Sequence, residues 1–465
     1  MAKTLTWVER SLKDADLLRR GDLFGRDDDG WLGATIDSRG DCSQRIFFAL
    51  KGEHTDGNRF AGEARSKGCR AVIIDRKDTV DEVVHNRIPF FLVEDSLTAL
   101  QQLARAYRGS VDVRVIAVTG SAGKTTTKEY IKMILKKNYK VHSNRGNLNN
   151  HIGVPLTLLE MDHESEYLIS EVAANHVGEI DFLAEILSPD IGVITNIGDA
   201  HIGLFGSRAK IAEAKAELLH RIEAAGTAVL PGDDDYLEVL MKGTRCKIVT
   251  FGYGDECTFG ISSIVEQEER IAFEINGQRL AIRTFGLYNV LNAAAAFAVG
   301  DLCGIEIEHI AQAFAEVEPI RGRAHMQRVR DVVLIDDSYN ANPTSMRVSL
   351  DAMCRVAGKR RIAILGDMAE LGSYSDSEHR QLGSYIVGSC VDRVYWLGEE
   401  GQHVAEGMGS GEKSILLFDG LEELCGFVEG DLQSGDVVLV KASRASALDK
   451  LVARLQQTVL KEDGK

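Results

Sequence analysis

A glycine-rich loop that ends in a lysine and a threonine is the strongest chemical signal in the sequence. It reads Thr119-Gly120-Ser121-Ala122-Gly123-Lys124-Thr125-Thr126. Glycines allow backbone N–H groups to converge on an anion at the start of a helix. We predict that Gly120–Thr126 bind the phosphates of a nucleoside triphosphate. Lys124 would then reach the β- and γ-phosphates, and the Thr125 hydroxyl would bind Mg²⁺.

The residues around this loop have the pattern that the motif requires. Val113–Val118 is an apolar, β-branched run, which predicts a buried strand. Tyr130, Ile131 and Ile134 follow at helical spacing. The usual first glycine of the motif is replaced by Val118, so the loop is a shortened variant. An ordinary strand–turn–helix with a chance Gly-Lys pair is the alternative.

Polar side chains follow two further predicted strands. Glu171 closes a strand over Tyr167–Val172, and His201 follows a strand over Ile191–Ile197. Ligands of open α/β sheets bind at the carboxyl ends of the strands, and Mg²⁺ prefers oxygen ligands. We therefore predict that Glu171 and His201 bind the metal. For His201 alone, a loop histidine satisfied by its neighbours remains the alternative.

A lysine lies on the apolar face of a predicted helix. The helix over Ser207–Ile222 has an apolar face formed by Ile211, Leu218 and Leu219, and Lys215 falls inside it at the helical repeat. A buried lysine is costly unless it is paired or chemically altered. Either its ammonium extends to solvent, or a lysine of lowered pKa reacts with CO₂ and becomes an anionic Mg²⁺ ligand.

Two asparagines lie at the start of an alanine-rich helix predicted near Val290–Val299. Asn289 and Asn292 are three residues apart, so one helical face could present both amides. Adenine offers matching donors and acceptors. Capping of the helix is the simpler alternative.

Polar clusters also occur in the first and last parts of the chain. Ser38, Arg39 and Lys51 could supply donors to an anionic ligand, although solvated surface loops are the simpler explanation. In the last part, polar segments follow three predicted strands, and each alone is ordinary turn chemistry. Together they predict one cleft that faces the nucleotide. The three segments are Asp336–Pro343, Gly366–Gly372 and Lys441–Arg444.

These elements predict an α/β protein with three domains. Residues 1–110 combine short strands and helices. Residues 111–320 alternate strands and helices around the glycine loop, which indicates a doubly wound, mostly parallel sheet with antiparallel hairpins at its edge. A linker near Glu316–Arg323 leads to a second α/β unit over residues 321–465.

Composition excludes several classes of partner. The chain has 465 residues and a net charge of −16, which disfavours nucleic acid and acidic membranes. It has no signal-peptide core and no apolar run of about 18 residues, so we expect a cytoplasmic protein without membrane insertion. The eight cysteines include no CxxC pair. We expect neither a zinc site nor a disulfide framework, but reduced residues in the core.

The motifs resemble the Mur ligase family over nearly the whole chain. Family signals are TGSAGKTTT (119–127), the Glu171 and His201 segments, AKAEL (214–218) and DDSYNANP (336–343). Four further segments resemble the family member that adds D-alanyl-D-alanine: FFALKGEHTDG (47–57), GNLNNHIGVPLTLL (146–159), DSYNANPTSM (337–346) and LGDMAELG (365–372). Long motifs in matching order argue against chance similarity.

The resemblance implies an N-terminal domain that binds a UDP-sugar, a central domain that binds ATP and a Rossmann-like C-terminal domain that closes over both. It implies ligation of D-alanyl-D-alanine to UDP-N-acetylmuramoyl-tripeptide through an acyl phosphate, with ATP and Mg²⁺ as cofactors. We expect a cytoplasmic monomer. Addition of a single amino acid to a UDP-muramyl peptide, glutamate ligation to folate, and a non-catalytic nucleotide switch are the alternatives.

The resemblance also assigns roles residue by residue. Lys124 and Gly120–Thr126 would hold phosphate. Thr125, Glu171, His201 and a carbamylated Lys215 would hold Mg²⁺. Asn289, Arg323 and Asp337 would contact the nucleotide. The UDP-sugar would be bound by Ser38 and Arg39, and Lys51, Asn147 and Asn150 lie in the neighbouring substrate motifs. The candidates for binding the dipeptide or phosphate are Asn340, Asn342, Lys441, Ser443 and Arg444.

Two positions depart from the family pattern. Tyr288 stands where a histidine is common, and Ala442 stands where a glycine is common. The change at Tyr288 concerns the contact with the adenine base of the nucleotide. The second affects the 441–444 loop, because alanine resists positive φ.

Overall fold

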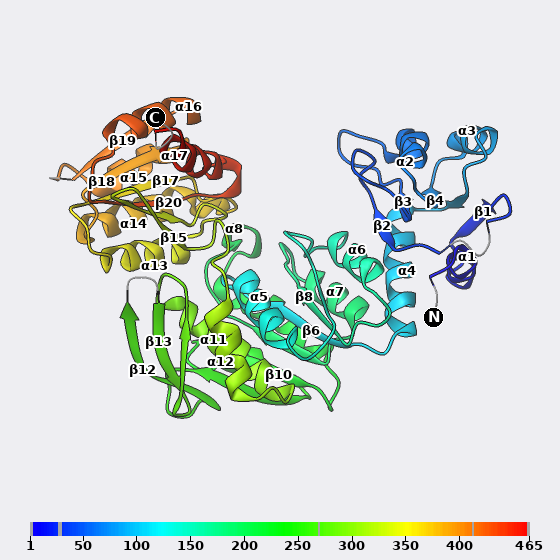
Figure 1. The fold of residues 1–465 in the computed structure, drawn as a ribbon, viewed down its shortest axis with the longest axis horizontal. Helices are drawn as coiled ribbons and strands as arrows, with labels where there is room; N and C mark the ends of the chain where they lie inside the picture. The colour runs from blue at the N-terminus through cyan, green and yellow to red at the C-terminus, as the bar shows by residue number, and fades with distance from the viewer. Residues whose placement is uncertain (1–2, 27–29, 268–269, 412, 463–465) are drawn as a thin grey trace.

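The computed structural model describes residues 3–26, 30–267, 270–411 and 413–462, which form three α/β domains around three sheets (Figure 1). The predicted fold class is confirmed. No helix in the described ranges combines the length and apolar content that crossing a bilayer would need.

The N-terminal sheet has the strand order β1-β5-β4-β3-β2, in which only β1 is antiparallel. The runs Phe47–Phe48, Ala71–Ile74 and Phe90–Val93 are buried in it, as apolar strands covered on both faces should be. The elements are α1 (Leu5–Asp14), β1 (Leu18–Asp22), β2 (Gly33–Thr35), β3 (Arg45–Phe48), η1 (Gly57–Phe60), α2 (Ala61–Ser66), β4 (Ala71–Ile74), η2 (Lys77–Thr79), α3 (Val80–His85), β5 (Phe90–Val93) and α4 (Ser96–Ser110).

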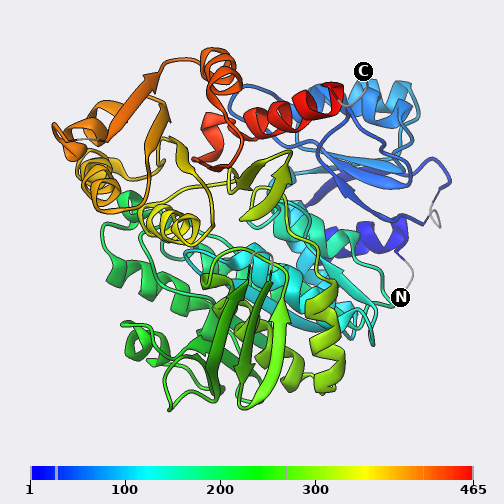
Figure 2. The ribbon, with the colours of Figure 1, turned by 60° about the vertical axis from the view of Figure 1, so that its left-hand side comes forward.

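The central sheet has the order β14-β13-β12-β11-β10-β9-β6-β8-β7. All neighbours from β12 to β7 are parallel, and β12, β13 and β14 form the predicted antiparallel hairpins, green in Figures 1 and 2. The elements are β6 (Arg114–Thr119), α5 (Lys124–Leu135), β7 (Val141–Ser143), α6 (Gly153–Glu160), β8 (Tyr167–Glu171), α7 (Glu179–Leu187), β9 (Ile191–Ile194), α8 (Ile202–Phe205), α9 (Arg208–His220), β10 (Thr227–Pro231), α10 (Leu237–Met241), β11 (Lys247–Gly252), β12 (Phe259–Gln267), β13 (Arg270–Ile275), β14 (Gln278–Ile282), α11 (Tyr288–Leu302) and α12 (Ile307–Glu316).

The C-terminal sheet has the order β15-β16-β20-β17-β18-β19, and only β15 is antiparallel. The carboxyl ends of β16, β17 and β20 therefore meet at one edge, as the three polar clusters require. The elements are β15 (His325–Val329), β16 (Val332–Asp336), α13 (Pro343–Cys354), β17 (Arg360–Gly366), η3 (Gly372–Tyr374), α14 (Ser375–Gly388), β18 (Arg393–Leu397), α15 (Gly401–Met408), β19 (Ser414–Phe418), α16 (Leu421–Asp431), β20 (Asp436–Lys441), η4 (Arg444–Ser446) and α17 (Asp449–Glu462).

One disulfide contradicts the prediction that all cysteines are reduced. Cys354, at the end of α13, is bonded to Cys390, with 5.5 Å between their Cα atoms. The two cysteines are 36 residues apart, and packing of α13 against α14 brings them together, so their spacing carried no signal. The six other cysteines are free, and all except Cys257 are buried.

The N-terminal and central domains share one apolar core. A single cluster of buried side chains includes Leu5 and Phe48 from the first domain and Val154 and Ile180 from the second. The ammonium of Lys3 donates to two carbonyls near the end of α6, at 2.6 and 2.8 Å, and lies over the rings of Trp31 and Tyr107. These contacts fix the first domain on the second.

Replacing Lys3 with methionine should flatten the pH dependence of stability above neutrality. Burial lowers the pKa of Lys3 from 10.5 to about 8. Between these values the unfolded chain binds more protons than the folded chain, so Lys3 makes the free energy of unfolding rise with pH. From about pH 8 to about pH 10 the rise is about 2 kcal/mol. Urea unfolding at each pH measures the free energy of unfolding, and Lys77→Met, at an exposed position, is the control. If the free energy of unfolding of Lys3→Met rose with pH as much as that of the parent, the prediction would be contradicted.

Candidate functional site

The glycine loop lies between β6 and α5, as predicted. Gly120 has φ +147° and Gly123 has φ +79°, and a Cβ on Gly123 would lie 2.1 Å from the Asn292 amide oxygen. Asn196, which follows the neighbouring strand β9, holds the loop. Its side-chain amide accepts from Ala122 N and donates to Ala122 O, both at 3.0 Å. The positive φ of both glycines disfavours a side chain at these positions, and at Gly123 the close approach of Asn292 adds to this effect.

Lys124 and Thr125 begin α5 at the carboxyl end of β6. The Lys124 ammonium donates to Gly120 O at 2.8 Å, and the Thr125 hydroxyl donates to the Glu171 carboxylate at 2.8 Å. Burial lowers the pKa of Lys124; the charge of Glu171 opposes this shift and that of Arg323 adds to it. The loop lysine, the hydroxyl and the carboxylate are thus within one small region.

Two asparagines that were not predicted as site residues, Asn144 and Asn149, hold Glu171. The Asn149 amide donates to its carboxylate at 2.9 Å, and Asn144 accepts from its backbone N–H at 2.9 Å. The selected neighbours lie elsewhere: Asn147 is exposed, and Asn150 accepts from backbone N–H groups at the start of α6. The loop 144–150 has no periodicity that could indicate which amide faces the carboxylate.

Lys215 is buried on α9, with 4 % of its surface exposed. Burial, assisted by the positive charge of Lys124, lowers the pKa of Lys215 to about 7. Within the described ranges its ammonium has no hydrogen-bond or ion-pair partner. A lysine that is half neutral near pH 7 is a nucleophile for CO₂, so the environment suits the predicted carbamate.

The donors in this region fit Mg²⁺. Thr125 and Glu171 supply hard oxygen atoms that already lie 2.8 Å apart, and a carbamate on Lys215 would supply more. A cationic Lys215 would not fit. His201 follows β9, which neighbours β6 on the side opposite β8, so its loop lies at the same edge of the sheet.

His201 contacts the C-terminal domain. Its Nδ1 forms an ion pair with Glu370 of the β17–η3 loop, and both residues adopt the left-handed conformation, with φ +61° and +63°. A second link joins Thr344 to Asp199, with the hydroxyl 2.7 Å from the carboxylate. Glu370 has no signal in the local sequence, because its partner belongs to another domain.

Two predicted arginines flank Tyr339. The Arg323 guanidinium lies 3.8 Å and the Arg444 guanidinium 5.1 Å from the ring centre. Arg323 also donates to the Thr125 hydroxyl at 3.3 Å. Thr125, Arg323 and Tyr339 line a cavity of about 660 Å³ between α5 and residues 316–321. The linker thus supplies positive charge next to the phosphate loop.

Several predicted residues of the C-terminal domain bond to one another. Asp337 accepts from the Lys441 ammonium at 2.6 Å and from Ser349 at 2.7 Å, and Lys441 also donates to Asn340 O. Asn342 caps α13 through a reciprocal bond with Ser345. Ser443 is buried, and its backbone N–H donates to Asp367 O at 3.1 Å. Their ligand contacts remain predictions.

Asn289 and Asn292 lie together, as their spacing predicts. Asn292 donates to the Asn289 amide oxygen at 2.9 Å, and Asn289 donates to Phe285 O at 2.9 Å. Both are buried beneath the glycine loop. In this arrangement they support the loop, and the adenine contact of Asn289 remains a prediction.

The predicted UDP-sugar residues lie apart from the phosphate loop, in the N-terminal domain. Ser38 donates to Glu63 at 3.0 Å, and the exposed Arg39 pairs with Asp37. Lys51 is exposed. No hydrogen bond or ion pair in the described part of the chain joins these three residues to the other domains.

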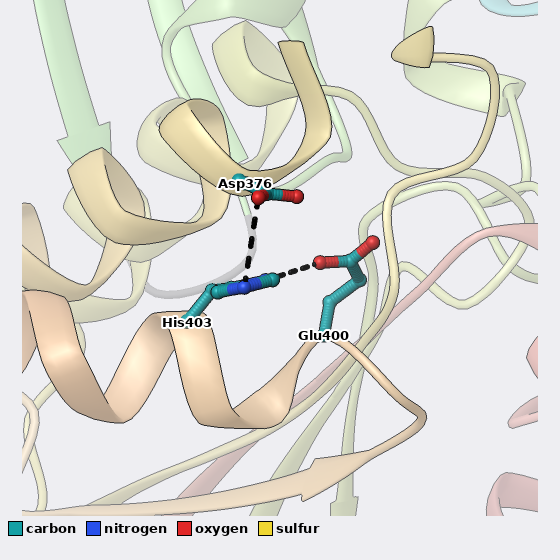
Figure 3. Close-up of side chains that lie close together, drawn as sticks. All are labelled: Asp376, Glu400 and His403. Atoms are coloured by element: carbon teal, nitrogen blue, oxygen red, sulfur yellow. Dashed lines mark hydrogen bonds and ion pairs between the residues drawn. The ribbon is translucent and has the colours of Figure 1, made fainter. Parts of the chain in front are cut away.

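A second cluster of charged side chains lies in the C-terminal domain (Figure 3). His403 lies between two carboxylates: its Nδ1 is 2.7 Å from Glu400, and its Nε2 is 3.8 Å from Asp376. Each ring nitrogen therefore faces a different carboxylate. This geometry is typical of an ion pair that ties α14 to α15, and we assign no metal to it.

Replacing Gly123 with alanine should weaken ATP binding at least tenfold. The left-handed backbone costs ~1–2 kcal/mol for a residue with a Cβ, and Asn292 cannot retreat because it is bonded to Asn289. Calorimetric titration with a non-hydrolysable ATP analogue measures the change. Gly178→Ala is the control: its φ is +90° but no atom lies within 4 Å, so it carries only the backbone cost. Equal affinity of Gly123→Ala and the parent would contradict the prediction.

Three α/β domains with a phosphate loop in the central one define the class of P-loop nucleotide-binding enzymes. Family models agree in detail: one described as "Mur ligase family, catalytic domain" matches residues 33–108, "Mur ligase middle domain" matches 118–300 and "Mur ligase, glutamate ligase domain" matches 322–444. The chain belongs to the Mur ligase family, whose members include ATP-dependent ligases.

Relatives are similar over nearly their whole length. A UDP-N-acetylmuramoyl-tripeptide–D-alanyl-D-alanine ligase of Bacillus subtilis is 36% identical, covering 92% of this chain and 94% of the relative. The enzyme of the same name from Escherichia coli is 32% identical over 91% and 93%. MurF of Acinetobacter baumannii superposes with a TM-score of 0.86 at 30% identity, covering 98% and 99%. MurF of Thermotoga maritima in complex with ADP gives 0.78 at 30% identity, covering 92% and 98%.

Proposed function

We propose that this chain joins D-alanyl-D-alanine to UDP-N-acetylmuramoyl-tripeptide with hydrolysis of ATP, in the cytoplasmic stage of peptidoglycan synthesis. Similarity to ligases of this name, over about nine-tenths of both chains, is the observation that carries the proposal. The contact between Thr125 and Glu171 beside the phosphate loop supports it. We propose domain limits of 1–110, 111–320 and 321–465, and a monomer.

The reaction must bring two anions together. The terminal carboxylate of the tripeptide attacks the γ-phosphorus of ATP, and ADP leaves, which gives an acyl phosphate. The amine of D-alanyl-D-alanine then attacks the acyl carbon, loses a proton, and phosphate leaves from the tetrahedral intermediate. The main barrier is electrostatic, so positioned positive charge supplies most of the catalysis.

The residues near the loop suit this task. Backbone N–H groups of Gly120–Thr126 would hold the phosphates, and Lys124 would stabilise charge on the γ-phosphate. Arg323, which already reaches Thr125, would add charge from the linker. Thr125, Glu171, His201 and carbamylated Lys215 would hold Mg²⁺. Bound there, Mg²⁺ would act as a Lewis acid that neutralises phosphate charge.

A coupled assay tests the substrate. The protein is incubated with ATP, Mg²⁺ and UDP-N-acetylmuramoyl-tripeptide, and either D-alanyl-D-alanine or free D-alanine. We expect phosphate release and a pentapeptide mass with the dipeptide alone. Phosphate release with D-alanine but not with the dipeptide would instead assign a ligase that adds one amino acid. ATP binding without turnover would assign a nucleotide switch.

A further inference from the structure

Glu370 of the C-terminal domain contacts a predicted metal ligand of the central domain. Its carboxylate pairs with Nδ1 of His201, and its carbonyl accepts from Gly203 N at 3.2 Å. Glu370 is thus joined to the loop after β9 at two points, once by its side chain and once by its backbone. Both His201 and Glu370 have positive φ, a conformation that non-glycine residues keep only when their surroundings hold it.

Both loops are fixed by further contacts. A Cβ on Gly203 would lie 2.3 Å from the backbone carbon of Leu371, so the two chains touch at backbone distance. The Tyr374 hydroxyl donates to Gly206 O at 2.9 Å. Behind the loop, the fully buried His379 accepts from Met368 N at 3.1 Å. The position of Glu370 is therefore determined from both sides.

The other carboxylate near His201 is already engaged. Asp199 forms a two-point ion pair with Arg208 and accepts from Thr344. Within the described residues, Glu370 is the acidic side chain paired with His201. A proton on Nδ1 would let His201 donate to Glu370 and would leave a lone pair on Nε2.

We propose that Glu370 is a positioning residue that orients His201 as a ligand of Mg²⁺. Histidines that bind metals usually donate their other ring N–H to a carboxylate, which sets the tautomer and the ring orientation. Here the carboxylate comes from a different domain. The metal site is therefore complete only when the C-terminal domain is docked on the central one. This inference rests on the proposed function and its metal ligands.

Mn²⁺ binding tests the proposal without turnover. The full chain is titrated with Mn²⁺ in the presence of a non-hydrolysable ATP analogue, and free Mn²⁺ is measured by electron paramagnetic resonance. We expect Glu370→Ala to weaken binding 10- to 100-fold. Glu370→Gln should recover most of the affinity, because its amide oxygen still accepts from Nδ1. Imidazole ¹⁵N shifts of His201 should show the Nδ1–H tautomer in the parent and in Glu370→Gln.

Two controls separate orientation from docking. Tyr374→Phe removes another bond across the same interface, and Glu399→Ala removes an exposed carboxylate of the same domain; both should bind Mn²⁺ within about twofold of the parent. The proposal is overturned if Glu370→Ala binds like the parent while His201→Ala does not, or if Tyr374→Phe weakens binding as much as Glu370→Ala. If His201→Ala also binds normally, the metal ligands of the proposed function are wrong as well, although the ligase assay would still decide the reaction.

Discussion

Replacing Lys215 with alanine should lower turnover about 1000-fold, which corresponds to ~4 kcal/mol. The lysine is buried without a partner among the described residues, and its pKa of about 7 leaves much of the amine neutral. The neutral amine would attack CO₂, lose a proton and become a carbamate, which would supply anionic oxygen to the metal. Alanine cannot form this group, so excess bicarbonate should not restore activity, whereas binding of an ATP analogue should change little.

The matched control for this prediction is Lys210→Ala. Lys210 lies on the same helix but is exposed, so its loss should leave turnover unchanged. In protein equilibrated with ¹³CO₂, a carbamate carbon resonance should be present in the parent and in Lys210→Ala, and absent from Lys215→Ala. Turnover of Lys215→Ala at the parental rate would rule out the carbamate.

Replacing Lys124 with alanine should lower turnover at least 1000-fold and also weaken binding of the ATP analogue. Its ammonium lies at the end of the glycine loop, where charge would develop on the γ-phosphate of bound ATP. Lys124→Arg should not restore the activity, because a planar guanidinium does not fit the space of a compact ammonium. Single-turnover phosphate release and calorimetric titration measure the two effects.

Lys132→Ala on the same helix is the control, since Lys132 lies two turns farther along and pairs with Glu129. The two lysine predictions differ in one respect that the same titration reveals. Loss of Lys124 should impair nucleotide binding, whereas loss of Lys215 should impair chemistry alone. If both variants bound the analogue equally and turned over normally, the phosphate loop would not be the catalytic centre.

Local pattern predicted the elements that carry the site. The apolar run before Gly120 is β6, the buried Lys215 lies on α9, and the strands that end at Glu171 and Asp336 occur where they were expected. Such elements are encoded by neighbours in the sequence, since periodicity reports which face is buried. Strand β1, with the sequence LRRGD and mostly exposed residues, has no such pattern and was missed.

Contacts between segments that are distant in the sequence could not be predicted in this way. The partner of His201 is Glu370, and Arg323 meets Thr125 across 198 residues of chain. Asp337 and Lys441 were both assigned to ligands, but in this structure they bond to each other. Each polar cluster could be recognised in the sequence. Which residues pair within a cluster depends on how the sheets and loops approach one another in space, and sequence spacing does not predict this.

The common core of the first two domains determines which part of the molecule can move. Side chains from both domains fill one apolar cluster, whereas the C-terminal sheet has its own clusters, which few side chains from elsewhere reach. The first two domains should therefore behave as a rigid platform. We expect hinge motion in the short stretch between α12 and β15, so that movement of the C-terminal domain would leave the distance between the first two domains unchanged.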